Sequence, residues 1–247
     1  MHTRFEGRES DSPYIEAVWR GQAGRDYAPV CPASNRWNLL FLRQNGRVKV
    51  TVVGPLTRAT PVSQDEGTEW FGVTFQRGTF LPSVSIRNLL DEQATLPLAA
   101  QRSFQLAGSS FQFPDYENVE TFVERLVRKD LLISDPLVKA VLAGQPPEVS
   151  TRTVRRRFLL ATGLTYKVIA QIERAHLAAH LLEQGVSLLD TTYQAGYADQ
   201  SHMTRSLKHF IGSTPAQIAQ IKEADIAVHF IQDKILLPGY DGTVESS

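Results

Sequence analysis

The sequence predicts an α+β protein in which a β-rich N-terminal domain is followed by an all-α domain. Three observations support this fold class. Short alternating apolar segments, separated by glycine and proline, fill residues 14–113 and are typical of antiparallel sheets. From about residue 118 the apolar residues fall at helical spacing instead. The last third of the chain also contains an internal duplication at an offset of 49 residues.

The length of 247 residues suits two modest domains joined by a helix. We expect a β-rich domain over 1–115, a connecting helix over 116–133, an all-α domain over 134–222 and a C-terminal extension over 223–247. No apolar run approaches the roughly 18 residues that span a bilayer, and the N-terminus lacks the apolar core of a signal peptide. A single cysteine excludes an intrachain disulfide framework, so we expect a cytoplasmic protein with no membrane partner.

The clearest element of the first domain is a hairpin. An apolar run over 38–42 and an alternating segment over 48–52 flank Asn45-Gly46, a pair suited to turns that need positive φ. Phe71, Val73 and Phe75 alternate in the same way. We interpret the domain as a small antiparallel sandwich or barrel with a short helix near 84–92.

Helical spacing begins with a stripe of apolar residues over 119–127, which either forms a dimer or packs on the protein's own sheet; we favour packing on the sheet. Ser134-Asp135-Pro136 predicts a second helix start, since a capping side chain precedes a proline in the first turn. That helix must end by Gly144-Gln145-Pro146-Pro147. Residues 150–222 are helical in pattern, and the only expectation for the C-terminal extension is a strand over 226–231.

The duplication relates two helices that each end at a glycine followed by a threonine two residues later. Phe158 corresponds to Leu207, Arg156 to Arg205 and Gly163 to Gly212. On a helical wheel each helix has one apolar stripe and an opposite polar or basic face. A long helix over about 166–184 would hold the two outward faces at a fixed separation. Two such helices about one DNA turn apart, roughly 34 Å, can enter successive major grooves.

Charge is distributed unevenly although the formal net charge is zero. Residues 150–222 contain nine Lys/Arg and four Asp/Glu, an excess of five positive charges that the rest of the chain balances. A basic segment beside an acidic remainder indicates that one part meets phosphates.

The stretch 196–208, reading GYADQSHMTRSLK, and Gly212-Ser213-Thr214-Pro215 resemble the AraC/XylS DNA-binding domain, as does the earlier stretch 150–158. The resemblance implies two helix-turn-helix units, with Asp199 capping the second recognition helix. It also implies DNA contacts from two sets of residues: Arg152, Arg155 and Arg156 in the first helix, and Gln200, Ser201, His202, Thr204, Arg205 and Lys208 in the second. The chain departs from the family where 143–149 carries two prolines, so we expect an abbreviated first unit and more specificity from the second.

Residues 13–110 are similar to the cupin-like sensor domain of some family members, on short matches at 13–19, 53–55 and 71–75. Together the two resemblances imply a sequence-specific bacterial transcription regulator, ligand-responsive and not an enzyme. The partners implied are double-stranded DNA, RNA polymerase and a small-molecule effector, with the chain a monomer or a homodimer. No cofactor is expected, and no histidine lies between His2 and His176 to build a cupin metal site.

Several residues have two interpretations. Arg156 and Arg205 contact DNA or are solvated, His202 contacts a base or packs, and the pair His176 and His180 is structural or ligates metal; we favour DNA contact for the arginines and a structural role for the pair. Five aromatic residues either belong to the hydrophobic core or line a ligand pocket, and we favour the core: Trp19, Trp37, Trp70, Phe71 and Phe75. Two rival functions remain, a DNA-repair enzyme using Cys31 and a constitutive binder whose first domain only dimerises.

Overall fold

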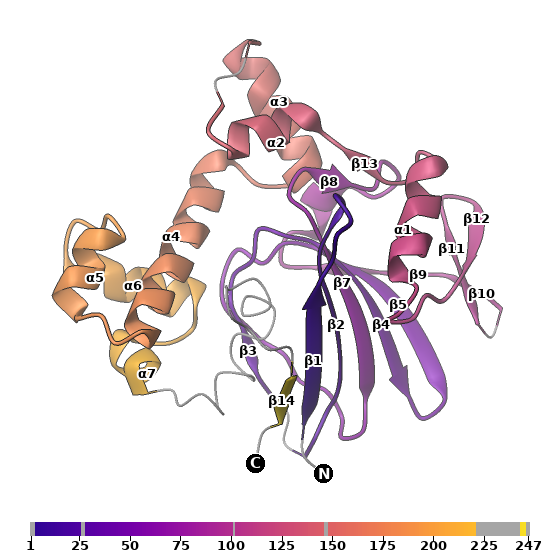
Figure 1. The fold of residues 1–247 in the computed structure, drawn as a ribbon, viewed down its shortest axis with the longest axis horizontal. Helices are drawn as coiled ribbons and strands as arrows, with labels where there is room; N and C mark the ends of the chain where they lie inside the picture. The colour runs from indigo at the N-terminus through magenta and orange to yellow at the C-terminus, as the bar shows by residue number, and fades with distance from the viewer. Residues whose placement is uncertain (1–2, 26–27, 101, 146–147, 221–242, 246–247) are drawn as a thin grey trace.

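The computed structural model describes residues 3–25, 28–100, 102–145, 148–220 and 243–245. A β-rich region is followed by a helical one, which confirms the predicted α+β class (Figure 1). The strands are β1 (Arg4–Glu9), β2 (Ile15–Gln22), β3 (Val30–Cys31), β4 (Asn38–Gln44), β5 (Arg47–Val53), β6 (Thr60–Pro61), β7 (Glu69–Phe75), β8 (Thr79–Phe80), β9 (Gln93–Leu96), β10 (Leu98–Ala100), β11 (Ser103–Leu106), β12 (Ser109–Gln112), β13 (Ile133–Ser134) and β14 (Thr243–Glu245). The helices are the 3₁₀ helix η1 (Ile86–Leu89), α1 (Val119–Arg128), α2 (Pro136–Leu142), α3 (Thr151–Thr162), α4 (Tyr166–Glu183), α5 (Leu188–Gln194), α6 (Gln200–Phe210) and α7 (Pro215–Gln220).

The β-rich region is built on one large antiparallel sheet with the strand order β14-β1-β2-β7-β4-β5-β9. A second sheet has the order β10-β11-β12, and two smaller sheets pair β8 with β13 and β3 with β6. Helix α1 lies beside the sheet, on the same side of the molecule as β10–β12 (Figure 1). The β-rich prediction is therefore confirmed, whereas its cupin-like detail stays a prediction.

The predicted hairpin joins β4 to β5. Asn38 pairs with Val53 and Gln44 with Arg47, and the turn residues Asn45 and Gly46 have φ values of 49° and 74°. Both central residues thus adopt the positive φ that the turn requires. The short helix expected near 84–92 is the 3₁₀ helix η1.

Helix α1 packs against its own sheet. Val119, Phe122, Val123 and Leu126 are buried and share one hydrophobic core with β-strand residues such as Phe104. The interpretation that the 119–127 stripe packs on the sheet is therefore confirmed.

The internal repeat extends to the caps of the helices. Ser150 and Asp199, which are 49 residues apart, cap α3 and α6 by accepting the backbone N–H groups of Thr153 and His202. The following helices α4 and α7 begin at equivalent threonines, Thr165 and Thr214, whose hydroxyls accept N–H groups three residues on. Capping side chains satisfy donors that a helix start leaves unpaired, so the same local chemistry starts the helices of both copies.

Helix α2 begins as predicted at Asp135, whose carboxylate accepts the N–H groups of Leu137 and Val138. Residues 143–150 connect α2 to α3, whereas only 195–199 connect α5 to α6. The first unit therefore has both of its helices and a connection three residues longer than the second, so the expectation of an abbreviated first unit is wrong. Pro146 and Pro147 lie outside the described residues.

The helical region is divided between two cores. Phe158, Ala161 and Ile169 belong to the core of the β-rich region, while Met203 and Leu207 belong to a separate core formed by α4 to α7. Figure 1 shows α4 running from α3 at the top to α5–α7 at the lower left. Most of the predicted C-terminal extension, including the strand expected over 226–231, lies outside the described residues; β14 pairs with β1.

Candidate functional site

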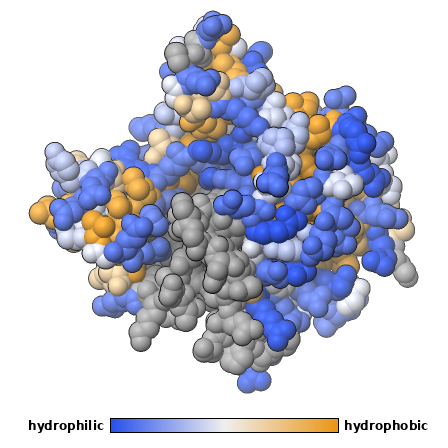
Figure 2. Space-filling view, viewed as in Figure 1, coloured by the Kyte–Doolittle hydropathy of each residue, from blue (hydrophilic) through white to orange (hydrophobic). Residues whose placement is uncertain are grey.

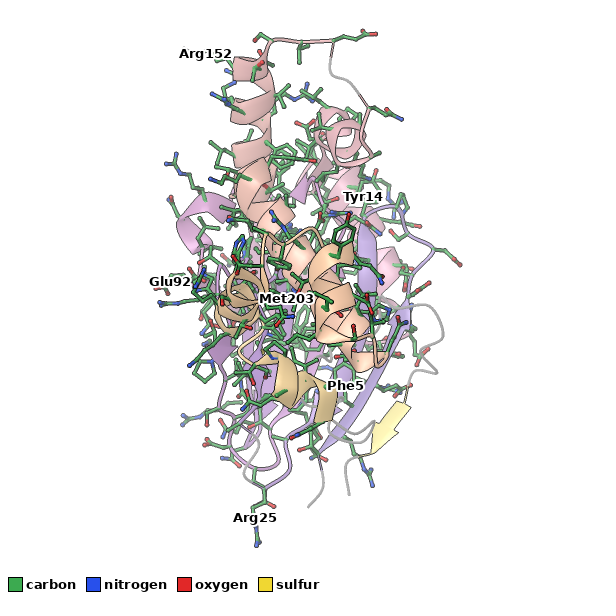
Figure 3. All side chains as sticks on the ribbon, turned by 90° about the vertical axis from the view of Figure 1, so that its left-hand side faces the viewer. Phe5, Tyr14, Arg25, Glu92, Arg152 and Met203 are labelled. Carbon is green, nitrogen blue, oxygen red and sulfur yellow. The ribbon has the colours of Figure 1, made fainter. Side chains whose placement is uncertain are left out.

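Helix α3 presents the basic face that the sequence predicts for the first recognition helix. Arg152, Arg155 and Arg156 are exposed, whereas Phe158 is 2% exposed on the opposite side. Figure 3 shows Arg152 at the outer tip of the helix, away from the body of the protein. The three guanidinium groups therefore share one solvent-facing side, where they are free to meet an anionic partner.

Helix α6 presents the second predicted set. Gln200, Ser201, His202, Arg205 and Lys208 are exposed and Thr204 is partly exposed, while Met203 and Leu207 are fully buried beneath them. The hydroxyl of Thr204 donates to the carbonyl of Gln200. All six predicted residues thus come together on one helix.

The start of α6 is fixed by two side chains. The carboxylate of Asp199 accepts the His202 N–H at 2.6 Å, as the family resemblance implied. The ring of His202 packs edge-on against Tyr197, with centroids 5.2 Å apart, and the Tyr197 hydroxyl lies 2.8 Å from the Ser206 hydroxyl. His202 therefore packs and is exposed at once, so both of its proposed roles stay compatible with the structure.

Helix α3 is tied to α2 by an ion pair that sequence reasoning did not identify. Arg157 donates to both carboxylate oxygens of Asp135, at 2.6 and 2.7 Å. These hydrogen bonds raise the pKa of Arg157 above its usual value. Asp135 thus caps α2 and holds α3, which fixes the angle within the first helix-turn-helix unit.

Helices α3 and α6 both end against the β-rich region. Gly163 and Gly212, equivalent in the repeat, have φ values of +71° and +87°. A Cβ atom at Gly163 would lie 3.2 Å from η1, and one at Gly212 would lie 2.8 Å from a methyl group of Val30. Only glycine combines this backbone conformation with such close approach.

Backbone hydrogen bonds add to the second of these contacts. The N–H groups of Ala33 and Ala59 donate to the carbonyls of Phe210 and His209 at 2.6 and 2.9 Å. The final carbonyls of a helix lack partners within the helix. The β-rich region therefore supplies donors for the C-terminal end of α6.

The loop at 33–36 also holds α4. The ring Nε2–H of His176 donates to the Ala33 carbonyl at 2.7 Å, and the Glu173 carboxylate accepts from Asn35 and from Arg77. The ring of His180 lies against the Gln184 amide. His176 and His180 therefore have structural contacts, and the described residues contain no group of three or more potential metal ligands.

A cavity of about 540 Å³ opens on one side of the large sheet, away from the helices described above. Aromatic side chains form its floor, where Phe41 lies 5.5 Å from Phe71 and 6.1 Å from Phe113 between ring centroids. Charged residues form its rim in two ion pairs, Arg20 with Glu6 and Arg43 with Glu69, together with Arg4. An apolar floor with polar groups at the edge is typical of small-molecule sites.

The wall of the cavity that contains Tyr116 is connected to α1 by cation–π contacts and hydrogen bonds. Arg8 and Arg20 lie over the ring of Tyr116, with guanidinium carbons 5.0 and 4.3 Å from its centroid. Hydrogen bonds from Arg8 to the Glu120 carboxylate hold the pKa of that carboxyl below its usual value. Movement of Tyr116 would therefore disturb the contact between β1 and the start of α1.

The five aromatic residues singled out from the sequence divide between two roles. Trp70 and Phe71 line the cavity, whereas Trp37 stacks on Phe75 with centroids 4.0 Å apart in the core. Trp19 is buried and donates to the Thr74 hydroxyl. Sequence reasoning missed the other lining residues because they come from distant segments; among them are Arg4, Arg20, Phe41, Arg43, Phe113 and Tyr116.

Comparison with known proteins identifies the helical region. A family model described as a helix-turn-helix domain matches residues 148–221, which confirms the AraC-type resemblance for this segment. The chain is 31% identical over 88 residues to the HTH-type transcriptional regulator RipA of Corynebacterium glutamicum, a match covering 35% of this chain and 27% of that protein. It is 30% identical over 73 residues to RipA of Corynebacterium diphtheriae, covering 30% and 22%. The chain thus spans about a quarter of the length of the curated relatives that it matches.

Among solved structures, the chain is similar to ToxT from Vibrio cholerae with a TM-score of 0.34 and 12% identity, covering 88% of this chain and 97% of that one. A ToxT structure bound to (E)-4-(8-methylnaphthalen-1-yl)but-3-enoic acid gives a TM-score of 0.38 and 11% identity, with coverage of 87% and 98%. In the part of the chain that the structure describes, no helix is long and apolar enough to cross a membrane.

Proposed function

Residues 148–221 are a helix-turn-helix domain of the AraC type, and from this premise we propose that the chain is a sequence-specific DNA-binding transcription regulator. The observation that carries the proposal is the repeat of one exposed face on two helices. Arg156 on α3 and Arg205 on α6 occupy equivalent, exposed positions above equivalent buried residues. The matched domain is a DNA-binding module rather than a catalytic one.

In this proposal α3 and α6 enter successive major grooves on one side of the duplex. The major groove accepts an α-helix, and an arginine fork pairs with the O6 and N7 atoms of guanine. Arg152, Arg155 and Arg156 contact bases or phosphates in one half-site. Gln200, Ser201, His202, Thr204 and Arg205 do so in the other, with Lys208 at a phosphate.

The β-rich region is proposed as a sensor that takes a small-molecule effector in the 540 Å³ cavity. Two strands lead from that cavity to the helices. β4 runs from the loop at 33–36, which holds α4 and α6, to Phe41 in the cavity floor. β7 runs from Phe71 in the floor to Phe75, two residues before Arg77, which pairs with Glu173 of α4. A ligand that shifts either strand would change the placement of α6.

Further partners follow from the same premise. We propose a cytoplasmic regulator that acts on transcription initiation through RNA polymerase, as a monomer or a homodimer. Helix α5 exposes Leu188, Leu189 and Tyr193, and hydrophobic residues reach the surface on the lobe formed by α5 to α7 (Figure 2). An exposed apolar group of this kind is compatible with a protein partner.

The test is selection from a random DNA library with the purified protein, repeated with Arg205→Ala and Arg156→Ala. We expect a site of two half-elements about one turn apart, relaxed at separate positions by the two substitutions, each costing about 1–3 kcal/mol of binding free energy. Arg47→Ala, at the tip of the β4–β5 hairpin, is the control that removes a positive charge elsewhere. Enrichment of no sequence, or equal selection by all variants, would contradict the proposal.

The sensor role has its own test, a screen of small molecules for a change in the affinity of the protein for the selected site. Compounds that act should lose their effect when Phe41→Asp places a charge in the cavity floor. A protein whose DNA affinity responds to no compound would be a constitutive binder instead.

A further inference from the structure

A second hollow, of about 370 Å³, lies between α4 and α6 and is separate from the cavity of the β-rich region. Helix α4 and the residue Tyr197 form one side and α6 the other. The lining residues are Gln171, Arg174, Tyr197, His202, Arg205, Ser206, His209 and Phe210.

The charges that line this hollow have one sign. Arg174 and Arg205 are cationic, and none of the described residues that line the hollow is acidic. Of the nearest acids along the chain, Glu173 pairs with Arg77, and the Asp199 carboxylate accepts the His202 backbone N–H at the start of α6. A concave surface with unopposed positive charge favours an anion.

Arg174 is held in place before any ligand arrives. Its guanidinium carbon lies 5.3 Å from the centre of the Tyr197 ring, and one of its nitrogens donates to the Gly196 carbonyl at 3.4 Å. Burial raises the pKa of the Tyr197 phenol above its usual value. One weak hydrogen bond leaves most of the five guanidinium donors of Arg174 unused.

The hollow adjoins the predicted DNA-reading face. His202 and Arg205 line it and also belong to the set of DNA contacts inferred for α6, whereas Arg174 and Gln171 come from α4, to which sequence reasoning assigned no DNA contact. A helix inserted in the major groove is flanked by the sugar–phosphate backbones, and phosphate contacts fix its orientation. The hollow therefore lies where one flank of α6 would meet a phosphate.

We propose that this hollow seats one phosphate of the DNA backbone beside α6, with Arg174 as its principal cation and Gln171 and His209 as further hydrogen-bond donors. The inference rests on the proposed function and adds the long connecting helix to the DNA interface. Guanidinium groups pair with phosphate through two parallel N–H donors, which suits a side chain already fixed by an aromatic ring. The contact carries no base preference and sets the angle of α6 in the groove.

Salt dependence of DNA affinity tests the phosphate seat directly. The affinity of the full chain for a random-sequence 30-base-pair duplex is measured between about 50 and 200 mM salt, since log K falls with log salt by about 0.9 per neutralised phosphate. Arg174→Ala should reduce that slope by about one and weaken binding to every sequence alike. Arg174→Lys should restore most of the slope, because a cation is retained, while Arg47→Ala should leave it unchanged.

The outcomes separate this inference from the function on which it rests. A wild-type protein with no salt-dependent affinity for any duplex would overturn the proposed function. A normal wild-type slope that Arg174→Ala and Arg47→Ala both leave unchanged would overturn only the phosphate seat.

A free phosphate is the other source of the same chemistry. If inorganic phosphate at constant ionic strength stabilises the wild type against thermal unfolding and not Arg174→Ala, while the DNA slopes are equal, the hollow binds a free phosphate and the DNA assignment is wrong. Thermal melting of Arg174→Ala without ligand, expected to match that of Arg174→Lys, shows that the fold is intact.

Discussion

The two helix-turn-helix units share one sequence pattern but pack against different parts of the protein. Helix α3 of the first unit contributes Phe158 to the core of the β-rich region and is held by Asp135 through Arg157. Helix α6 of the second unit covers a core of its own and contacts the β-rich region near its C-terminal end, through Phe210 and its neighbours.

This difference shows that an internal repeat conserves how a helix begins and ends better than what the helix packs against. Caps and glycine stops are local and recur at an offset of 49 residues. The partner of the buried stripe depends on where each unit lies. The first unit is continuous with the proposed sensor, while the second is joined to it by backbone hydrogen bonds and by the packing of Phe210 and Gly212.

The sharpest test of the shared core is Phe158→Ala, which should cost about 3–5 kcal/mol of unfolding free energy because a buried ring is lost. All three tryptophans lie in the β-rich region, so their fluorescence reports that region alone. We expect the fluorescence-detected midpoint in urea to fall. Leu160→Ala, on the same helix but 61% exposed, should change the free energy by less than about 0.5 kcal/mol. An unshifted tryptophan transition in Phe158→Ala would mean that the first unit is independent after all.

The complementary change is Leu207→Ala in the core of the second unit, where a fully buried side chain is lost at a cost of about 2–5 kcal/mol. Part of the far-ultraviolet circular dichroism signal should be lost at lower urea concentration, because α5 to α7 unfold first. The tryptophan transition should stay where it is. If both signals shift together, the two cores unfold as one and the comparison between the units fails.

The smallest effect should come from the contact between α6 and the β-rich region. Gly212→Ala meets both an unfavourable positive φ and a Val30 methyl group, and we expect a loss of about 2 kcal/mol in a urea titration. Gly185→Ala is the matched control. Gly185 has a φ of +79°, and a Cβ atom there would meet none of the described neighbours within 4 Å, so the substitution should cost only about 1 kcal/mol of unfolding free energy. Adding Val30→Ala should recover part of the Gly212→Ala loss. Equal losses at the two glycines would show that the contact has no energetic weight.

Features set by neighbouring residues could be predicted from the sequence. The Asn45-Gly46 turn, the Asp135 and Asp199 caps and the exposed face of α6 each depend on a few consecutive residues. The mutual position of these elements in space could not be predicted.

Non-local packing accounts for what was missed. Thr51 lies in the alternating segment over 48–52, on the same face as Lys49, yet it is fully buried. The cavity joins Arg20 of β2 to Phe113, more than ninety positions later in the chain. Arg174 belongs to no motif that the sequence analysis identified. It lies beside Tyr197, just before α6, because α4 packs against this part of the chain.

The junction at Ala33 affects how such a protein could diversify. The main chain of this one residue donates to α6 and accepts from His176 of α4, and its side chain is completely enclosed. Hydrogen bonds made by the main chain do not depend on the identity of the side chain, provided that the residue is not proline. At this enclosed position they persist with any residue small enough to fit. Selection could therefore change the residues of the cavity to suit new small molecules while the hydrogen bonds of Ala33 to α4 and α6 persist. Alanine scanning would not detect these hydrogen bonds.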